Sequence, residues 1–251
     1  MSGGIGPSGD ILLPQDEGKY KQAQDSNRPQ FSKDSPTLQP RRGIFTFRHL
    51  NAAAAAVVLS ASGMVSLEDF AFVLFSFIYM HAMAKVAFPN PNSFSDPPVF
   101  GENNKLLGLY VSIAAVIGLF LPIAYIFGGI FAGDKEGIKA AAPHVFLLAS
   151  QVFMEGVAFS GGFSLPIRVF VPVFYNSRRI FSIAEWLRAE ISKADEQHSG
   201  GTRRLYIGRG LAVANMALWC FNLFAFLLPV YLPKAFKKYY SDHKVKGAKG
   251  Q

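Results

Sequence analysis

Apolar residues along this chain gather in long runs, and the pattern predicts helices that cross a membrane. The clearest run is 106–132, which holds no charged side chain. A helix rises about 1.5 Å per residue, so this run would reach roughly 40 Å, more than the ~30 Å hydrocarbon core of a bilayer. A helix of a soluble protein needs only an apolar stripe toward its core. We therefore expect 106–132 to span a membrane, with a kink at Pro122.

Four further runs predict shorter spans on either side of it. Their expected positions are about 50–66, 70–88, 143–165 and 211–232. The first is rich in Ala and Ser, whose small side chains favour close packing of helices rather than lipid contact. The pattern as a whole predicts an all-α integral membrane protein, with a helical membrane domain over 50–232 and about five transmembrane helices.

The segment between the fourth and fifth of these spans is harder to place. Residues 165–175 are apolar but too short to cross, and they include Arg168, so we expect an interfacial or re-entrant piece. Residues 176–197 predict an amphipathic helix with Trp186 as an interfacial anchor and its basic residues off the apolar stripe. The predicted apolar stripe consists of Ile180, Ile183, Ala184, Leu187, Ile191 and Ala194. A cytosolic helical loop held by its own charge pairs is the alternative.

Polar tails flank the membrane domain. Residues 1–49 hold several prolines and no apolar run, which predicts a disordered tail. Residues 233–251 form a basic tail with six lysines. The distribution of Lys and Arg weakly favours an inside N-terminus. Five spans would then leave the basic tail outside, whereas six spans, with 163–175 crossing, would return it inside.

Charge and cysteine content narrow the function classes. The net charge is +8, yet charged residues are only 17% of the chain, below the ~25% of ordinary globular domains. The basic residues lie beside apolar runs, which indicates contact with lipid headgroups rather than with nucleic acid. The single cysteine, Cys220, lies within an apolar run, so an intramolecular disulfide and a CxxC zinc or redox site are excluded.

The most informative polar residue is Glu155, near the middle of the fourth predicted span. A charged carboxylate there costs about 2.5–3.5 kcal/mol on insertion scales, so we expect it to be functional or paired with another group. Gln151 lies one turn earlier on the same face. His81 in the second span falls at a similar depth, with Lys85 one turn further, so we expect Glu155 to contact one of them. The candidate site would bind a proton or cation, or else a paired glutamate holds the helices together.

Two asparagines and a glycine pair extend this candidate site. Asn215 and Asn222 are seven residues apart and lie on one face of the last span. They would line a polar path or hydrogen-bond between helices. Gly161-Gly162 with Pro166 breaks the fourth span, which would either bind an ion through backbone groups or simply end the helix.

Signatures of enzymes are missing from the sequence. It contains no HExxH motif, no P-loop and no glycine-rich dinucleotide fingerprint. Glu155 is the only carboxylate deep in an apolar run, which excludes a paired-carboxylate protease. We therefore expect no catalytic residues, no metal and no cofactor.

A resemblance to a known family supports the membrane prediction. The opening MSGGIGPSGDILLP and the stretch LSASGMVSLEDFAFVLFSFIYM resemble an uncharacterised family of plant multi-pass membrane proteins, a domain of unknown function. The resemblance implies a plant membrane protein and no particular mechanism.

Two functions follow as hypotheses. The leading one is a non-enzymatic protein of the endomembrane system or plasma membrane that organises the membrane or binds partners. Its partners would be the lipid bilayer and proteins that contact the 176–209 loop and the basic tail. The alternative is a transporter or channel for a proton, cation or small solute, centred on Glu155.

Overall fold

The computed structural model divides the chain into two compact units, Met1–Arg42 and Gly43–Gln251, and every residue that it describes belongs to the second. It describes Ala54, Val58, 62–89, 99–100, 105–160, 162–193 and 202–249, without the side chains of Ser62, Ser160 and 242–249. All regular structure in these residues is helical. The tail predicted over 1–49 and most of the span predicted over 50–66 lie outside the described residues.

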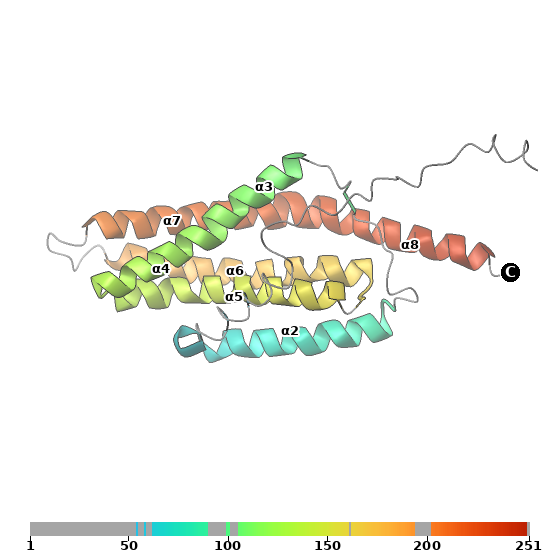
Figure 1. The fold of residues 1–251 in the computed structure, drawn as a ribbon, viewed down its shortest axis with the longest axis horizontal. Helices are drawn as coiled ribbons and strands as arrows, with labels where there is room; N and C mark the ends of the chain where they lie inside the picture. Colours follow the sequence, from blue (N-terminus) through green and yellow to red (C-terminus); the bar gives the residue numbers. More distant parts are fainter. Residues whose placement is uncertain are drawn as a thin grey trace, which may run out of the picture. The chain divides into compact units, whose positions relative to one another are not determined.

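The described helices form five continuous runs (Figure 1). A short 3₁₀ turn, η1 (Ser62–Met64), precedes the first of them, α2 (Leu67–Val86). The second run joins α3 (Lys105–Ala115), the π-helical η2 (Val116–Phe120) and α4 (Leu121–Ala132). Then come α5 (Lys135–Ser160) and α6 (Leu165–Ser192). The last run joins α7 (Thr202–Phe221), the π-helical η4 (Asn222–Tyr231) and α8 (Leu232–Lys249).

An antiparallel pair, α5 and α6, forms the centre of this unit, with α2 on one side and the α7–η4–α8 run on the other (Figure 1). At one end Lys193 Nζ, just after α6, lies 3.5 Å from Asp134 Oδ1, just before α5. Halfway along, Arg179 of α6 donates to Gln151 of α5. The two helices therefore run side by side over their whole length.

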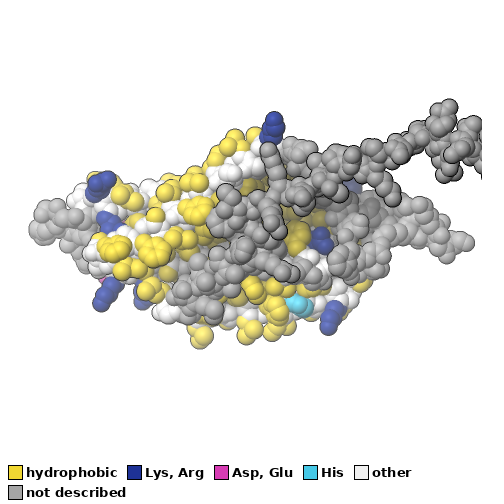
Figure 2. All heavy atoms as spheres, viewed as in Figure 1, with side chains coloured by type: hydrophobic (Ala, Val, Ile, Leu, Met, Phe, Trp, Pro, Cys, Tyr) yellow, Lys and Arg dark blue, Asp and Glu magenta, His cyan; other side chains and the backbone are white. Residues whose placement is uncertain are grey.

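Four of the described helices are long and apolar enough to cross a membrane. They are Leu67–Val86, Lys105–Ala132, Lys135–Phe159 and Thr202–Ser241. The apolar window of α5 is 67% buried, whereas those of α2 and the α3–η2–α4 run are only 17% and 11% buried. Large apolar side chains such as Leu74, Phe75 and Ile78 are exposed on α2, and hydrophobic atoms cover much of the described surface in Figure 2.

The structure corrects the prediction for 165–197. The expected short piece at 165–175 and the expected amphipathic helix at 176–197 are one helix, α6. Pro166 lies in its first turn, where the missing N–H would be unpaired in any residue, so it starts the helix rather than breaking it. Trp186, expected as an interfacial anchor, is fully buried.

The buried face of α6 also differs from the predicted apolar stripe. Its second half buries mainly polar residues, whereas Ile191 of the predicted stripe is 57% exposed. The buried residues of this half are Asn176, Arg179, Ser182, Ile183, Trp186 and Glu190. Hydrogen-bond partners on neighbouring helices decide which face is buried, and a stripe read from one helix does not include them.

The ends of the helices follow local rules. Ser66 caps α2, because its side chain accepts a hydrogen bond from the Asp69 N–H at 3.2 Å. Gly133 ends α4 with φ of 70°, a left-handed conformation that favours glycine. α5 begins at Lys135, eight residues before the predicted start at 143, and the predicted span 211–232 lies within the longer α7–η4–α8 run.

Candidate functional site

A polar network crosses the interior between α5 and α6. Gln151 Nε2 donates to Glu155 Oε1 at 2.7 Å, and Arg179 Nη2 donates to Gln151 Oε1. Gln151 therefore bridges two opposite charges. Arg179 is fully buried, whereas Glu155 is partly exposed. The glutamate and the arginine compensate each other's charge through the amide, which lowers the cost of burying either.

Trp219 of α7 extends this network to a third helix. Its ring lies under the guanidinium of Arg179, with 4.0 Å between the Arg179 Cζ and the ring centroid. Its Nε1 donates to Asn215 Oδ1 at 3.2 Å, and its backbone carbonyl accepts from Asn176 Nδ2 at 3.1 Å. The indole thus stabilises the buried cation through its ring and orients Asn215 through its N–H.

Pro122 and the π-helical segment before it explain why Asn215 and His144 are buried where they are. Proline has no N–H, so the carbonyl of Gly118, four residues earlier, loses its α-helical donor. His144 Nε2 lies 2.8 Å from that oxygen. The Leu121 N–H bonds the Val116 carbonyl, in the wider π-helical register.

The carbonyl of Ile117 is released by the same change of register. Its π-helical donor would be the N–H of the residue five positions later, which is again Pro122, and proline has no N–H. Asn215 Nδ2 donates to the Ile117 oxygen at 3.0 Å. The two side chains from α5 and α7 therefore replace backbone donors that the proline removes.

The close contact between η2 and α7 requires a glycine at position 118. A Cβ on Gly118 would lie 2.5 Å from Trp219 Cζ2, closer than real Cβ contacts allow. Gly118 thus lets the indole lie directly on the backbone of η2, next to the carbonyls that His144 and Asn215 bind.

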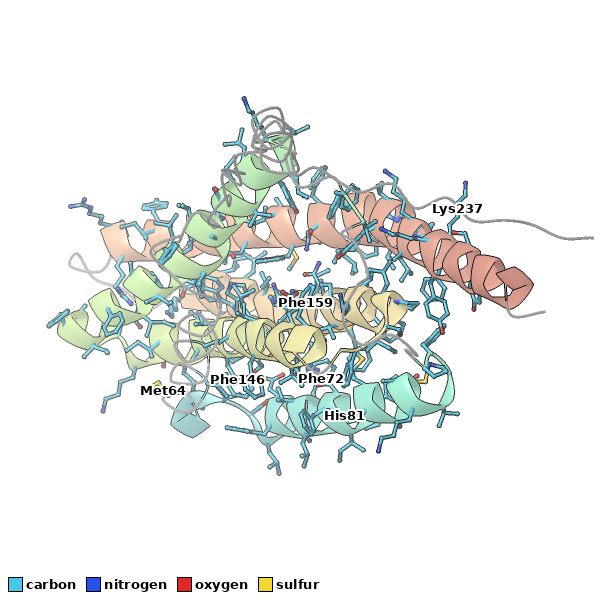
Figure 3. The ribbon with its side chains drawn as sticks, turned by 45° about the vertical axis from the view of Figure 1, so that its right-hand side comes forward. Met64, Phe72, His81, Phe146, Phe159 and Lys237 are labelled. Carbon is cyan, nitrogen blue, oxygen red and sulfur yellow. The ribbon has the colours of Figure 1, made fainter. Side chains whose placement is uncertain are left out.

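The other residues predicted for the site lie elsewhere. His81 Nδ1 is 2.9 Å from the Phe77 carbonyl, and its ring packs edge-on against Phe163. Lys85 is exposed at the end of α2. The expected contact of Glu155 with His81 or Lys85 is not among the interactions of the described residues. Figure 3 labels His81 on α2.

Aromatic and polar contacts to α6 explain where α2 lies. Phe72 packs on Phe174 and Tyr175, and Ser76 Oγ lies 2.7 Å from Tyr175 OH. Asn222 takes part in another link between helices, because its Oδ1 accepts from Tyr110 OH on α3 at 2.8 Å. Both predicted asparagines thus bond to the α3–η2–α4 run.

A second cluster closes one end of the helical bundle. The fully buried Glu190 of α6 accepts from Tyr125 OH at 2.7 Å, and Lys193 Nζ lies 3.1 Å from the same oxygen. Arg204 Nε of α7 donates to Asp134 Oδ2 at 2.7 Å, and its Nη2 donates to the Tyr125 carbonyl at 3.1 Å. These bonds join α4, α6 and α7.

Asp134 of this cluster lies in the turn between α4 and α5, outside the apolar helices. Burial raises the pKa of its carboxyl, but the hydrogen bonds from Arg204 and the Gly137 backbone N–H, with the charges of Lys193 and Arg204, outweigh this and hold the pKa below its ordinary value. Asp134 is therefore ionised near neutral pH and takes part in the cluster as an anion.

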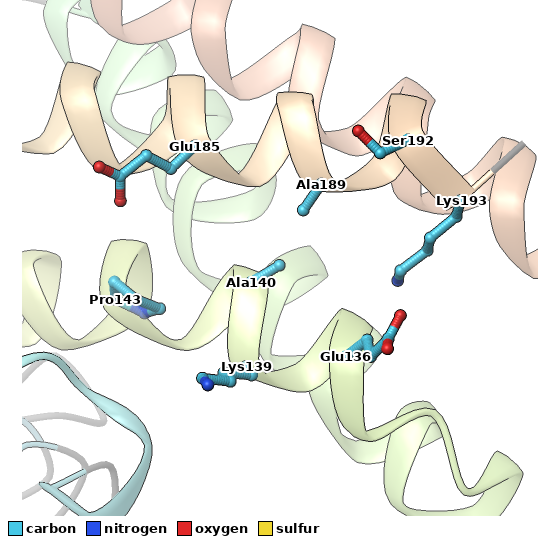
Figure 4. Close-up of a pocket in the computed structure, with 8 residues that line it drawn as sticks. All are labelled: Glu136, Lys139, Ala140, Pro143, Glu185, Ala189, Ser192 and Lys193. Atoms are coloured by element: carbon cyan, nitrogen blue, oxygen red, sulfur yellow. The ribbon is translucent and has the colours of Figure 1, made fainter.

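The cavities described near this end have mixed linings. A groove of about 510 Å³ between α5 and α6 is bordered by both signs of charge, with Glu136 and Lys193 at one end (Figure 4). A neighbouring cavity of about 550 Å³ touches Asp134, Glu190 and Arg204. Neither is lined by Glu155. Within the described residues, His, Cys, Asp and Glu form no group of three that could hold a metal ion.

Comparisons with known proteins found one family. Residues 45–240 match a family described as a domain of unknown function, DUF7733. Neither the search of curated proteins nor the search of solved structures found a match.

Proposed function

Because the chain belongs to the DUF7733 family, whose function is unknown, we propose from its structure that it is a multi-pass integral membrane protein that organises the membrane or binds partners and catalyses no reaction. The apolar exposed faces of α2 and the α3–η2–α4 run support insertion into lipid. The sequence resemblance adds a plant origin to this proposal, and we place the protein in the endomembrane system or plasma membrane.

One observation carries the choice of an organising role over transport. The two charged groups between α5 and α6 are linked through Gln151, which accepts from Arg179 and donates to Glu155. Trp219 covers the guanidinium. Asn215, predicted as part of a polar path, instead bonds a backbone carbonyl of η2. Such a network holds helices together.

The antiparallel α5–α6 pair supports a particular topology. If α5 crosses the membrane, α6 crosses it too, because α6 is as long and the two helices pack along their whole length. The described residues then make five crossings, and the span predicted over 50–66 would be the sixth. Both tails would lie on one side, so the basic α8 would face the same compartment as the N-terminus.

Partner binding would use surfaces that this topology leaves free. Much of the predicted contact region at 176–209 is internal as far as Glu190, and its exposed described residues include Arg188, Ser192 and Arg203. The groove of Figure 4 opens near Ser192, between α5 and α6. At the other end, exposed lysines of α8 such as Lys237 would meet lipid headgroups or acidic protein segments.

A proton or cation carrier is the second candidate, and one feature favours it. Arg179 is fully buried, yet its Nε and Nη1 have no hydrogen-bond partner among the described residues. Glu155, at the other end of the network, is partly exposed. A transported proton or cation would have the accessible carboxylate of Glu155 to bind, and this carboxylate is linked through Gln151 to a buried cation.

Flux through proteoliposomes separates the two functions. We expect wild-type protein to show no proton or cation flux above empty liposomes. Glu155→Gln should lower its thermal stability, because Arg179 then has no compensating charge. Glu185→Gln, on the exposed face of α6, is the matched control and should leave stability unchanged. Flux that disappears in Glu155→Gln and persists in Glu185→Gln would establish the carrier instead.

A further inference from the structure

A groove lies between α4 and α7 where the two helices separate. The α3–η2–α4 run crosses the last run at the contact of Gly118 with Trp219, and the two diverge toward the end that carries Gly133 (Figures 1 and 3). The cavity between them has a volume of about 670 Å³. Tyr125 and Leu211, both buried, form its base.

Small residues leave room along the groove for a narrow apolar chain. Ala124 and Gly128 of α4 face Gly210 and Ala214 of α7 across it, and Leu121 and Ile207 add apolar walls. A Cβ on Gly210 would meet no atom within 4 Å. The groove is therefore open from its side, where an inserted protein meets lipid tails.

Two arginines stand at the mouth of the groove, at the level of the charged cluster. Arg203 is exposed. Arg204 uses Nε and Nη2 for Asp134 and the Tyr125 carbonyl, and its Nη1 lies over Gly128, 3.4 Å from where a Cβ would be. Tyr206, 65% exposed, stands beside them. A phosphate at this position would meet the exposed guanidinium of Arg203 and the Nη1 of Arg204, and guanidinium nitrogens suit its geometry.

We propose that this groove binds one anionic phospholipid, with an acyl chain along the small residues and its phosphate between Arg203 and Arg204. The inference rests on the proposed insertion into a membrane and adds a specific ligand to it. A transmembrane helix of a partner or of a second copy would fill the apolar part, but it would give no counterion to Arg203, which has no partner among the described residues, whereas Arg204 already binds Asp134. The lipid accounts for both halves of the groove.

Native mass spectrometry of the full chain tests this site. The protein is purified in neutral detergent with equal phosphatidylglycerol and phosphatidylcholine and released from the micelle. Wild-type protein should retain one phosphatidylglycerol in preference to phosphatidylcholine. Arg203→Gln should reduce that preference about fivefold, since one basic residue near anionic lipid contributes ~1 kcal/mol. Arg188→Gln, on α6, is its control and should keep the preference.

A second pair of variants tests the acyl-chain half. Gly210→Leu adds a side chain whose Cβ meets nothing within 4 Å, and it should fill the groove and remove the retained lipid. Gly108→Leu makes the same change on α3, where a Cβ also meets nothing within 4 Å, and should leave it bound. Equal retention of both lipids by wild-type protein, or no effect of Gly210→Leu, would overturn the proposal. So would a dimer that Gly210→Leu dissociates while lipid stays bound.

Failure of the site is distinguishable from failure of the proposed function. Alkaline carbonate extraction of membranes reports insertion independently of any bound lipid. Protein that stays in the membrane pellet but shows no lipid preference would refute the groove site alone. Protein released into the supernatant would refute the membrane role on which the site rests.

Discussion

Arg179 shows how a charge is accommodated in the interior of this protein. Its guanidinium donates to the amide of Gln151 and lies on the indole of Trp219. Glu155, which compensates the charge, accepts from the other end of the same amide. An unpaired buried charge would cost several kcal/mol, so Gln151 is as necessary to the pair as either charged residue. The glutamate was predictable from the sequence, because a carboxylate in an apolar run is conspicuous.

At the same scale, Asp134 makes stability depend on pH. Its folded-state pKa is lowered, so its contribution is full above the unfolded pKa of about 4 and is lost as pH falls through the lower folded value. We expect Asp134→Asn to be less stable than wild type at neutral pH. The difference should shrink as pH falls below about 4. Thermal unfolding of both proteins in detergent between neutral pH and pH 3 measures it, and a difference independent of pH would contradict the assignment.

At the scale of the helical element, Pro122 determines which side chains its neighbours supply. Two carbonyls of η2 are bonded by His144 and Asn215 because the proline provides no N–H. The loss of a backbone donor at Pro122 followed from the sequence alone. The identity of the replacement donors did not, since they come from α5 and α7, far away along the chain.

A double-mutant cycle tests this account of η2. Asn215→Leu alone should destabilise the protein by about 1–3 kcal/mol, because the Ile117 oxygen and the Trp219 N–H lose their partner. Pro122→Ala restores a backbone donor, so the same substitution in that background should cost less. A coupling of about 0.5–3 kcal/mol is expected for such linked groups. Strictly additive effects would show that Asn215 acts independently of the proline.

Two glycines of α7 give a matched test of its packing. A Cβ on Gly208 would lie 2.6 Å from Glu190 Oε2 and 2.7 Å from Tyr125 OH, whereas a Cβ on Gly210 meets nothing within 4 Å. Gly208→Ala should therefore lower the thermal midpoint. Gly210→Ala should raise stability by about 0.5–1 kcal/mol, because alanine loses less entropy in a helix. Equal effects of the two would place α7 farther from Glu190 than the structure does.

Hydropathy located α2, the α3–η2–α4 run, most of α5 and the apolar part of the last run. It did not predict α8, which falls in the expected basic tail 233–251, and it misplaced α6. Its second half carries Arg178, Arg179, Glu185, Arg188 and Glu190, which made it resemble a surface helix. Arg179 and Glu190 are buried next to partners on α5 and α4, since Arg179 donates to Gln151 and Glu190 accepts from Tyr125. A sequence pattern records the charge of a residue but not the partner that offsets it, so long polar helices of this kind escape prediction.

At the scale of the whole molecule, the position of α6 determines the topology. A surface helix would leave residues 176–193 on the side where α5 ends, and the basic α8 on the opposite side from the N-terminus. A crossing helix returns the chain to the side where α5 begins. The Lys193–Asp134 contact, which joins the end of α6 to the start of α5, favours the crossing.

Cysteine labelling in sealed vesicles tests most directly whether α6 crosses the membrane. In a Cys220→Ser background, single cysteines replace Lys105 at the start of α3, Glu136 at the start of α5 and Ser192 at the end of α6, all exposed. We expect Glu136→Cys and Ser192→Cys to react with a membrane-impermeant maleimide from one side, and Lys105→Cys from the other. If Ser192→Cys instead reacts on the same side as Lys105→Cys, α6 does not cross and the topology proposed for this protein is wrong.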